Sequence, residues 1–449
     1  MSHGVKSESF RASYLQGSLY RSVDGASSAV NLGIMLDLTG PLDRPRLLAA
    51  LHRLSARHEA LRTILTSDDG QILQEVADAT RVHLLIEDVA DRSAPNSEAT
   101  RLARQHVAQP FAFHGPTLWR AMLIKCGLER HVLTLSLHHA IVDGSSATIL
   151  VNELCELYDN PDGDSIPPPD LQFADYAAWE RGTAASVPVA AWKDRLRPYR
   201  ESIHPVCGAS IGREYHTVPY EIPDMQPGHL LMVRKLAKAL RTPVVAVLVA
   251  AAAASLGNGR SEAVIGLVRA NRERTELRDV VGYVADLTPL TIDLSGSPTL
   301  TDLTQRAAES LAFSHDHPAP LAALSPLLRD GGTRGPLLDV CLNYRPAHTT
   351  PERAVRGLRV VSTAVPQPTV ARHHWWDGAA AIDFQLRVDN GRLTGHVGID
   401  SHSVPPQLAQ AITDRFARFL IYGAARPDVP VGEWCWTRQG EKWTNTTRA

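Results

Sequence analysis

Two adjacent histidines followed by an aspartate and a glycine form the part of the sequence best suited to chemistry, in the run His138-His139-Ala140-Ile141-Val142-Asp143-Gly144. An imidazole exchanges a proton near neutral pH, so a histidine held on rigid backbone can act as a general base. Gly144 permits a tight turn, and a buried Asp143 would need a partner and could orient the loop. Paired histidines also occur as metal ligands or as hydrogen-bonded core residues, so the pair alone leaves these interpretations open.

The segments on either side of the pair predict how it is held. Residues 132–137 form a short apolar run with the length and composition of a buried strand. Residues 145–154 predict a helix that opens with short polar capping residues. We therefore expect the histidines to lie in a loop between a strand and a helix N-terminus, which is rigid scaffolding for a proton acceptor.

The rest of the chain predicts an α/β fold in layers. Residues 34–38 predict a strand, and Asp43 with Pro45 opens an amphipathic helix. Residues 263–268 predict another strand, as do residues 337–342, although an aspartate interrupts the latter. Buried strands that alternate with helices are typical of layered α/β domains.

Two further signals predict a hairpin and a buried helix. Asn390-Gly391 separates two runs of alternating polarity, which predicts a β-hairpin. Residues 244–256 are the longest apolar run, shorter than the ~20 residues that a transmembrane helix needs. Thr242 as the cap, Pro243 in the first turn and Gly257 after the end predict a helix of the core.

A chain of 449 residues is long enough for two lobes. The small and polar stretch 181–188 is the best candidate for a hinge. It divides the chain into an N-terminal lobe, residues 1–181, which carries the histidines, and a C-terminal lobe, residues 182–449.

Composition limits the classes of partner. A formal net charge of −2 offers no electrostatic reason to bind nucleic acid or an anionic membrane. The five cysteines show no CxxC spacing, and the N-terminus has no apolar secretory signal, so we expect a cytoplasmic protein without disulfides. His315-Asp316-His317 and His373-His374 have no third ligand spaced to complete a metal site, so none is expected.

With its neighbours, the histidine motif resembles the HHxxxDG motif of nonribosomal peptide synthetase condensation domains, which belong to the chloramphenicol-acetyltransferase-like superfamily. The other motifs of that family have counterparts in the same order, at residues 14–16, 57–63, 173–179, 281–290 and, more loosely, 317–321. The resemblance implies two chloramphenicol-acetyltransferase-like lobes that form a V-shaped pseudo-dimer, with the active site between them.

The resemblance also implies a reaction. Such domains transfer an acyl or aminoacyl group, held as a thioester on the phosphopantetheine of an acyl- or peptidyl-carrier protein, to an amine or hydroxyl acceptor, and they bind no cofactor of their own. By this resemblance His139 is the catalytic base or orients the nucleophile, and the backbone N–H of Gly144 stabilises the oxyanion. His138 and Asp143 would be structural, with Arg272 pairing with Asp143 and tying the active loop to the second lobe.

Three positions depart from the family pattern. Ser145 stands where many peptide-forming members have Trp, Asn271 where Gly commonly precedes the Arg, and Asp286 where Asn is usual. Ser145 and Asp286, together with Trp376, are expected along the substrate channels. The smaller Ser145 would widen the acceptor side.

Three functions remain in consideration. The chain begins with Met and ends soon after the condensation region, so we expect a free-standing enzyme with a small amine or alcohol as acceptor. The first alternative is a CoA-dependent O- or N-acyltransferase of the same superfamily. The second is a member without catalysis that only docks carrier proteins or tailoring enzymes, which the intact His139, Asp143 and Gly144 disfavour.

Overall fold

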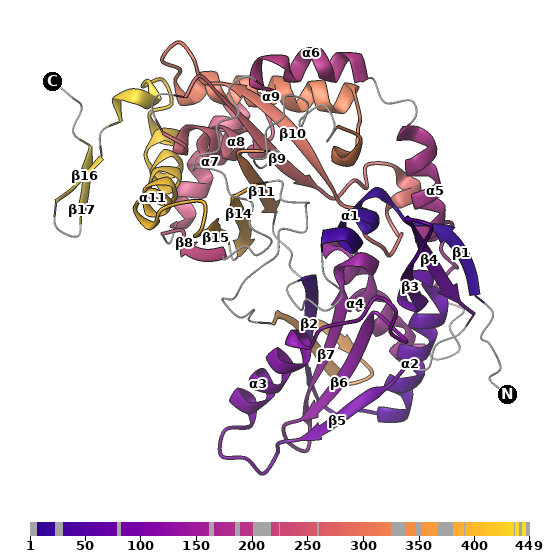
Figure 1. Cartoon of the computed structure of the whole chain (residues 1–449). Coiled ribbons are helices and arrows are strands. Elements are labelled where there is room, and N and C mark those ends of the chain that lie inside the picture. Colours follow the sequence, from indigo (N-terminus) through magenta and orange to yellow (C-terminus); the bar gives the residue numbers. More distant parts are fainter. Residues whose placement is uncertain are drawn as a thin grey trace. The chain divides into compact units, whose positions relative to one another are not determined.

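The computed structural model places most of the chain in two compact units (Figure 1). It describes residues 7–22, 30–78, 82–160, 166–184, 189–200, 217–223, 225–257, 260–324, 338–346, 352–365, 380–389, 391–434, 436–439 and 442–445. The first unit comprises Met1–Ala185, Ala270–Asp286 and Thr349–Asp377, and the second comprises Ser186–Arg269, Leu287–His348 and Gly378–Ala449. This division differs from the single boundary expected between residues 181 and 182, because two later segments return to the first unit.

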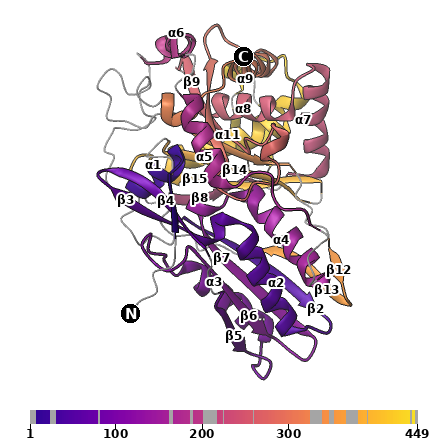
Figure 2. The same ribbon diagram turned by 90° about the vertical axis from the view of Figure 1, so that its right-hand side faces the viewer.

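The main sheet of the first unit has six strands in the order β12-β13-β2-β7-β6-β5. Their bounds are Arg353–Val355, Leu358–Ala364, Asn31–Thr39, Arg130–His138, Trp119–Lys125 and Leu84–Asp88. Helix α3 (Pro95–Ala108) packs on one face, whereas α2 (Arg44–Arg57) and α4 (Gly144–Asp159) lie side by side on the other (Figures 1 and 2). The predicted strands at 34–38 and 132–137 are confirmed as parts of β2 and β7.

A smaller sheet completes the first unit, with β1 (Ser7–Arg11), β4 (Gln71–Ala77) and β3 (Thr63–Asp68) in that order. Helices α1 (Tyr14–Ser22) and α5 (Phe173–Ala184) pack beside it. The predicted start of α2 is confirmed, since the Asp43 side chain accepts the Arg46 N–H at 3.0 Å. Residues 181–184 of the proposed hinge belong to α5, and residues 185–188 lie outside the described residues.

The second unit is built around another six-stranded sheet, in the order β10-β9-β11-β14-β15-β8. The strands are Asp286–Asp293, Glu262–Arg269, Val340–Arg345, Ile382–Asp389, Arg392–Asp400 and Thr217–Glu221. The helices are α6 (Val189–Arg200), α7 (Pro227–Ala239), α8 (Val244–Ser255), α9 (Leu300–Asp316) and α11 (Pro406–Ile421), and β16 (Trp436–Gln439) pairs with β17 (Lys442–Asn445). The predicted hairpin is confirmed as antiparallel β14 and β15.

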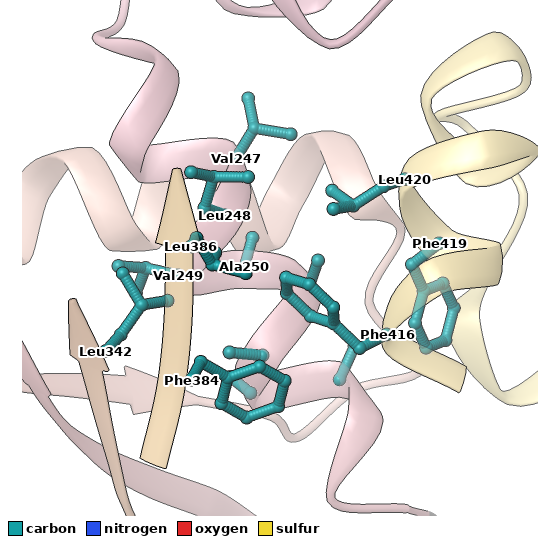
Figure 3. Close-up of a cluster of buried hydrophobic side chains, with 14 of the residues drawn as sticks. Val247, Leu248, Val249, Ala250, Leu342, Phe384, Leu386, Phe416, Phe419 and Leu420 are labelled. Atoms are coloured by element: carbon teal, nitrogen blue, oxygen red, sulfur yellow. The ribbon is translucent and has the colours of Figure 1, made fainter. Parts of the chain in front are cut away.

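Apolar side chains between α8, α11 and the sheet make up the core of the second unit (Figure 3). Val247, Phe384 and Phe416 are fully buried there, and the ring centroids of the two phenylalanines lie 4.5 Å apart. The helix predicted at 244–256 is confirmed as α8, but Pro243 and not Thr242 is its N-cap residue. No single helix among those described is long and apolar enough to cross a bilayer; α7 and α8 pass only as a pair bent by 107°.

The strand predicted at 337–342 begins later, as β11 at Val340. Asp339 is buried immediately before it and accepts the Val264 N–H at 2.8 Å as well as a hydrogen bond from Arg260. A buried carboxylate requires such partners. The aspartate that interrupts the pattern therefore marks the start of the strand.

Candidate active site

The first histidine of the motif is a buried part of the turn that follows β7. His138 is the last residue of that strand, and its Nδ1 accepts the Ala140 N–H at 3.1 Å, which caps the short 3-10 helix His139–Ile141. Its ring packs edge-on against Phe113, with centroids 5.0 Å apart. Burial lowers the pKa of His138 to about 3, so the ring is neutral at physiological pH. This geometry supports a structural role for His138.

The second histidine is half-buried at the start of the 3-10 turn. Burial is the main cause that lowers the pKa of His139 to about 4, and the charge of Asp143 opposes this shift. The ring of Tyr283 lies 4.9 Å from the His139 ring and is tilted by 58° to it. His139 is therefore neutral at physiological pH, the state in which an imidazole can accept a hydrogen bond from a nucleophile.

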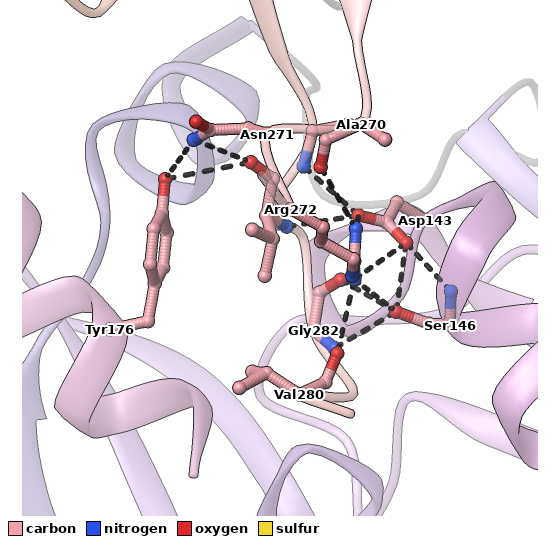
Figure 4. Close-up of polar contacts among 10 residues, drawn as sticks. Asp143, Ser146, Tyr176, Ala270, Asn271, Arg272, Val280 and Gly282 are labelled. Atoms are coloured by element: carbon pink, nitrogen blue, oxygen red, sulfur yellow. Dashed lines mark hydrogen bonds and ion pairs between the residues drawn. The ribbon is translucent and has the colours of Figure 1, made fainter. Parts of the chain in front are cut away.

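Asp143 is buried and surrounded by hydrogen-bond donors. It is the N-cap residue of α4, and only 1% of it is exposed. Oδ1 accepts the Ser146 N–H at 2.8 Å and an Arg272 N–H at 3.0 Å, and it lies 2.8 Å from the Ser146 hydroxyl. Oδ2 accepts from Arg272, Val284 N–H and Ala285 N–H at 2.7, 3.1 and 2.9 Å (Figure 4). These charge-assisted and backbone hydrogen bonds hold both carboxylate oxygens in place.

The structure contains the ion pair between Asp143 and Arg272, and the guanidinium binds both carboxylate oxygens. Arg272 also donates to the backbone carbonyls of Ala270 and Val280, each at 3.0 Å (Figure 4). Both partners belong to the first unit, since Ala270–Asp286 is part of it. The pair therefore links Asp143 to the segment 270–286 within the first unit. The boundary predicted from the sequence, between residues 181 and 182, had placed Asp143 and Arg272 in different lobes.

Ser146 is a site residue that the sequence reasoning missed. It is fully buried, and its hydroxyl accepts the Gly282 N–H at 3.0 Å and an Arg272 N–H at 3.2 Å. Its own hydrogen has the Gly282 carbonyl and Asp143 Oδ1 within reach, both at 2.8 Å. The available signal was its position three residues after the capping aspartate, where a polar side chain commonly meets the cap.

Close packing explains why glycine occupies position 282. A Cβ atom there would lie 2.1 Å from Cδ2 of Phe173 in α5. The segments 173–179 and 281–290, which were recognised as separate motifs, thus meet at this point. Because Gly282 also bonds to the Ser146 hydroxyl, this contact adjoins the hydrogen bonds around Asp143.

Gly144 begins the 16-residue helix α4 and presents the opposite situation. A Cβ atom at this position would meet no other heavy atom within 4 Å among the described residues. The N–H groups of a helix's first turn have no intrahelical acceptor and carry partial positive charge. Gly144 therefore lies at an open helix N-terminus one residue after the fixed carboxylate.

Asn271 has a local reason to replace the more common glycine. Its φ is 54°, in the left-handed region that Asn tolerates better than most residues. Its amide donates to the Tyr176 hydroxyl at 3.1 Å and to the Val284 carbonyl at 3.2 Å (Figure 4). This side chain thus ties the segment that carries Arg272 to α5.

The three residues expected along the channels lie in different surroundings. Ser145 is half-buried in the first turn of α4, next to Gly144. Asp286 is half-buried at the start of β10, directly after Ala285, whose amide binds Asp143. Trp376 lies outside the described residues, as do His373 and His374. Within the described ranges, no three His, Cys, Asp or Glu side chains are grouped so as to hold a metal ion.

Comparison with known proteins gives one consistent result. The family described as "Condensation domain" matches residues 12–443. A probable non-canonical nonribosomal peptide synthetase of Salinispora arenicola is 30% identical over 317 residues, which are 66% of this chain and 4% of that protein. The chain spans only a small part of such relatives, 6% of a linear gramicidin synthase of Brevibacillus parabrevis and 18% of a dimodular synthase of Bacillus subtilis.

Solved structures share the fold. The X-domain in its complex with OxyB from teicoplanin biosynthesis has a TM-score of 0.78 and 21% identity, covering 95% of this chain and 96% of that one. SgcC5 from Streptomyces globisporus, in complex with a naphthyl-ethanediol and sucrose, has a TM-score of 0.76 and 22% identity over 94% of this chain and 100% of that one. These similarities confirm the expected α/β fold of chloramphenicol-acetyltransferase-like lobes.

Proposed function

Since the chain belongs to the Condensation domain family, we propose that it joins an acyl or aminoacyl group, delivered as a carrier-protein thioester, to an amine or hydroxyl acceptor. Domains of this family are acyl- and peptidyl-transferring enzymes that form amide bonds, and they act on substrates carried on phosphopantetheine. The observation that carries the proposal is the neutral, half-buried His139, which lies four residues before Asp143, the buried carboxylate that caps the open start of α4.

His139 acts on the nucleophile. A neutral imidazole nitrogen accepts a hydrogen bond from the acceptor's N–H or O–H and directs its lone pair at the thioester carbonyl. With a pKa of about 4, His139 is a weak base toward a neutral amine. It is a better base toward the more acidic ammonium group that forms on attack, so orientation comes first and proton transfer follows. General acid–base help of this kind contributes about 10²- to 10⁴-fold.

The start of α4 stabilises the tetrahedral intermediate. The backbone N–H of Gly144 supplies a donor at a positive helix end, which suits the oxygen of the thioester carbonyl as it gains charge. The new C–N or C–O bond forms, the C–S bond breaks, and the proton from the nucleophile passes to the pantetheine thiolate. His138, Asp143 and Arg272 hold the turn and do not touch the reacting atoms.

The acceptor is an amine or an alcohol, and the half-buried Ser145 leaves more room for it than a tryptophan would. Asp286 and Trp376 are proposed along the same route. The names of the relatives, which include synthases of linear gramicidin, favour amide formation. The diol bound to SgcC5, a protein of the same fold, is a reason to test hydroxyl acceptors as well. Replacing Ser145 by Trp should narrow the range of acceptors, and an unchanged range and turnover would contradict this placement.

Two alternative functions can be tested in the same experiment. A CoA-dependent acyltransferase would use the same histidine with a different thioester. A docking protein without catalysis remains an alternative because the X-domain of similar fold was solved in complex with OxyB. Thioester consumption separates the docking protein from either enzyme, and the preferred thioester separates the two enzymes.

The test is mass spectrometry of acyl-carrier and acyl-CoA thioesters incubated with the protein and a mixture of small amines and alcohols. We expect the carrier to lose its acyl group and one condensed product to appear, whose mass identifies the bond. The His139→Ala variant is expected to remain folded and to lose about 10²- to 10⁴-fold of the turnover. Turnover of acyl-CoA alone would support the acyltransferase, and carrier binding without turnover would support the docking protein.

A further inference from the structure

Glu180 is a buried carboxyl group in α5 that the proposed reaction does not use. Only 6% of it is exposed, and it lies one helical turn after Tyr176. Oε2 accepts the Tyr14 N–H at 2.9 Å, and Oε1 lies 3.4 Å from the Tyr176 hydroxyl. A carboxyl group held this way has one oxygen fixed by the backbone and one facing the hydroxyl of Tyr176.

The Tyr176 hydroxyl has one hydrogen and two acceptors at nearly equal distance. The first is Glu180 Oε1 at 3.4 Å, and the second is the carbonyl oxygen of Val284 at 3.5 Å. The Asn271 amide donates to the hydroxyl oxygen at 3.1 Å and also to the Val284 carbonyl at 3.2 Å (Figure 4). The hydroxyl oxygen can accept more than one hydrogen bond, but the hydroxyl has a single hydrogen, which it can donate to either Glu180 or Val284.

Val284 connects the hydrogen bond of the Tyr176 hydroxyl to the proposed active site. Its own N–H and that of Ala285 donate to Oδ2 of Asp143 at 3.1 and 2.9 Å. The preceding residue, Tyr283, lies with its ring 4.9 Å from the His139 ring. A change in the hydrogen bond to the Val284 carbonyl therefore acts on the same three-residue segment that contacts both Asp143 and His139.

The surroundings of Glu180 disfavour its charge. Burial is the main cause that raises the pKa of Glu180 to about 7, and the negative charge of Asp286 acts in the same direction. The Tyr14 N–H, the Arg181 charge and the Tyr176 hydroxyl oppose this rise. The elements packed against α5 carry further charged groups, which are Glu8 and Arg11 in β1, Arg21 in α1, and Glu59 and Arg62 in the 3-10 helix Glu59–Arg62. Burial lowers the pKa of Arg181, and the charges of Arg11 and Arg21 act in the same direction.

We propose that Glu180 and Tyr176 are positioning residues that form a proton-sensitive hydrogen-bond switch for the segment 283–285 of the active site. When Glu180 is neutral, its Oε1–H donates to Tyr176, and Tyr176 donates to the Val284 carbonyl. When Glu180 is ionised, Tyr176 donates to the carboxylate instead, and Val284 keeps only its bond from Asn271. The neutral form therefore anchors the segment with one more hydrogen bond. The effect on catalysis rests on the proposed role of His139.

The expected result is a pH dependence of kcat/KM with an inflection near pH 7 and the higher value on the acid side. The change should be about twofold to tenfold, which corresponds to one net hydrogen bond. His139 does not produce this inflection, because its pKa is about 4. Glu180→Gln resembles the neutral acid, so it should keep the acid-side value into the alkaline range. Tyr176→Phe should give the lower value at every pH.

A matched control is Glu59→Gln. Glu59 is a half-buried carboxyl group of the same unit whose pKa is also raised by burial, but it makes no contact with Tyr176 among the described hydrogen bonds. This variant should leave the inflection near pH 7 in place. An inflection that survives in Glu180→Gln, or that disappears in Glu59→Gln, would overturn the proposal.

Hydrogen exchange tests the switch without any turnover. The amides of Val284 and Ala285 should exchange more slowly at about pH 6 than at about pH 8 after correction for the intrinsic rate, and this difference should vanish in Glu180→Gln. If the exchange difference is present but no substrate turns over, the proposed function fails and the switch stands. If turnover is present and exchange is the same at both pH values in the unaltered protein, the switch is refuted alone.

Discussion

The region around Asp143 and the core of the second unit are stabilised by different interactions: hydrogen bonds and an ion pair in the first, and apolar packing in the second. Around Asp143, backbone amides, a guanidinium and a serine hydroxyl converge on one buried carboxylate (Figure 4). Around Phe416, buried aliphatic and aromatic side chains make van der Waals contacts, which, unlike hydrogen bonds, have no preferred direction (Figure 3). When a substitution removes one member of a polar cluster, the remaining donors or acceptors stay buried without partners, and the protein is strongly destabilised. When a substitution shortens an apolar side chain in a core, the free energy of unfolding falls in proportion to the volume removed.

The largest effect is expected for Asp143→Ala. Removing this carboxylate takes away the only charged partner of Arg272 among the described residues, and it leaves the amides of Val284 and Ala285 without their acceptor. The free energy of unfolding should fall by about 3–5 kcal/mol, the usual result of breaking one half of a buried ion pair, and activity should be lost. Urea denaturation measures the loss. The control Glu352→Ala breaks a pair whose two side chains are exposed, Glu352–Arg359 at 2.9 Å, and should leave the free energy of unfolding nearly unchanged.

Full stability of Asp143→Ala with lost turnover would contradict the structural role of this residue. It would mean that the carboxylate serves the reaction and not the fold. The region around Asp143 would then not be an example of a polar cluster that stabilises the fold.

A loss of similar size, but of another kind, is expected for Phe416→Ala. The ring is fully buried against Phe384, and removing it creates a cavity that costs about 3–5 kcal/mol. Phe416→Leu should cost less because it fills part of the volume. Hydrogen exchange should report weaker protection in α8 and α11, while the amides of residues 282–285 keep theirs under native conditions. Equal loosening of residues 282–285 would show that the two regions are not independent.

The next effect depends on pH and concerns Glu180→Gln. The pKa of Glu180 is about 7 in the folded protein, above its ordinary value of 4.5, so folding takes up a proton between these values. The stabilising contribution of the carboxyl group is complete below about pH 4.5, falls as the pH rises toward 7, and is constant above that. The Gln variant should therefore be more stable than the unaltered protein at about pH 8, by at most on the order of 3 kcal/mol. Near pH 4.5 the two should unfold at the same urea concentration.

The smallest effect on stability is expected for Gly144→Ala. A Cβ atom at this position meets nothing within 4 Å among the described residues, so the free energy of unfolding should change by less than about 1 kcal/mol. If substrate passes over the start of α4, the added methyl group should still lower kcat/KM. Gly282→Ala is the informative contrast, since its Cβ would clash with Phe173 at 2.1 Å and should cost about 1–3 kcal/mol. Unchanged turnover in Gly144→Ala would remove the reason to place substrate there.

The sequence was most informative where local rules decide structure. The apolar run before His138, the cap at Asp43 and the Asn390-Gly391 turn predicted β7, α2 and the β14–β15 hairpin, because burial, capping and turn geometry depend on neighbouring residues. It was less accurate at element ends. The cap of α8 is Pro243 and not Thr242, and β11 starts only after the buried Asp339.

The sequence by itself determined the family motifs and the layered α/β class, and the resemblance that these motifs carry predicted the two lobes and the pairing of Asp143 with Arg272. Only the tertiary structure decided that Ser146, Gly282 and Tyr283 gather around that pair, and that the segment 270–286 belongs to the first unit. The physical reason is distance along the chain. A capping residue or a turn is specified within four residues, whereas the Asp143 cluster joins groups up to 142 residues apart, and their meeting depends on the packing of every element between them.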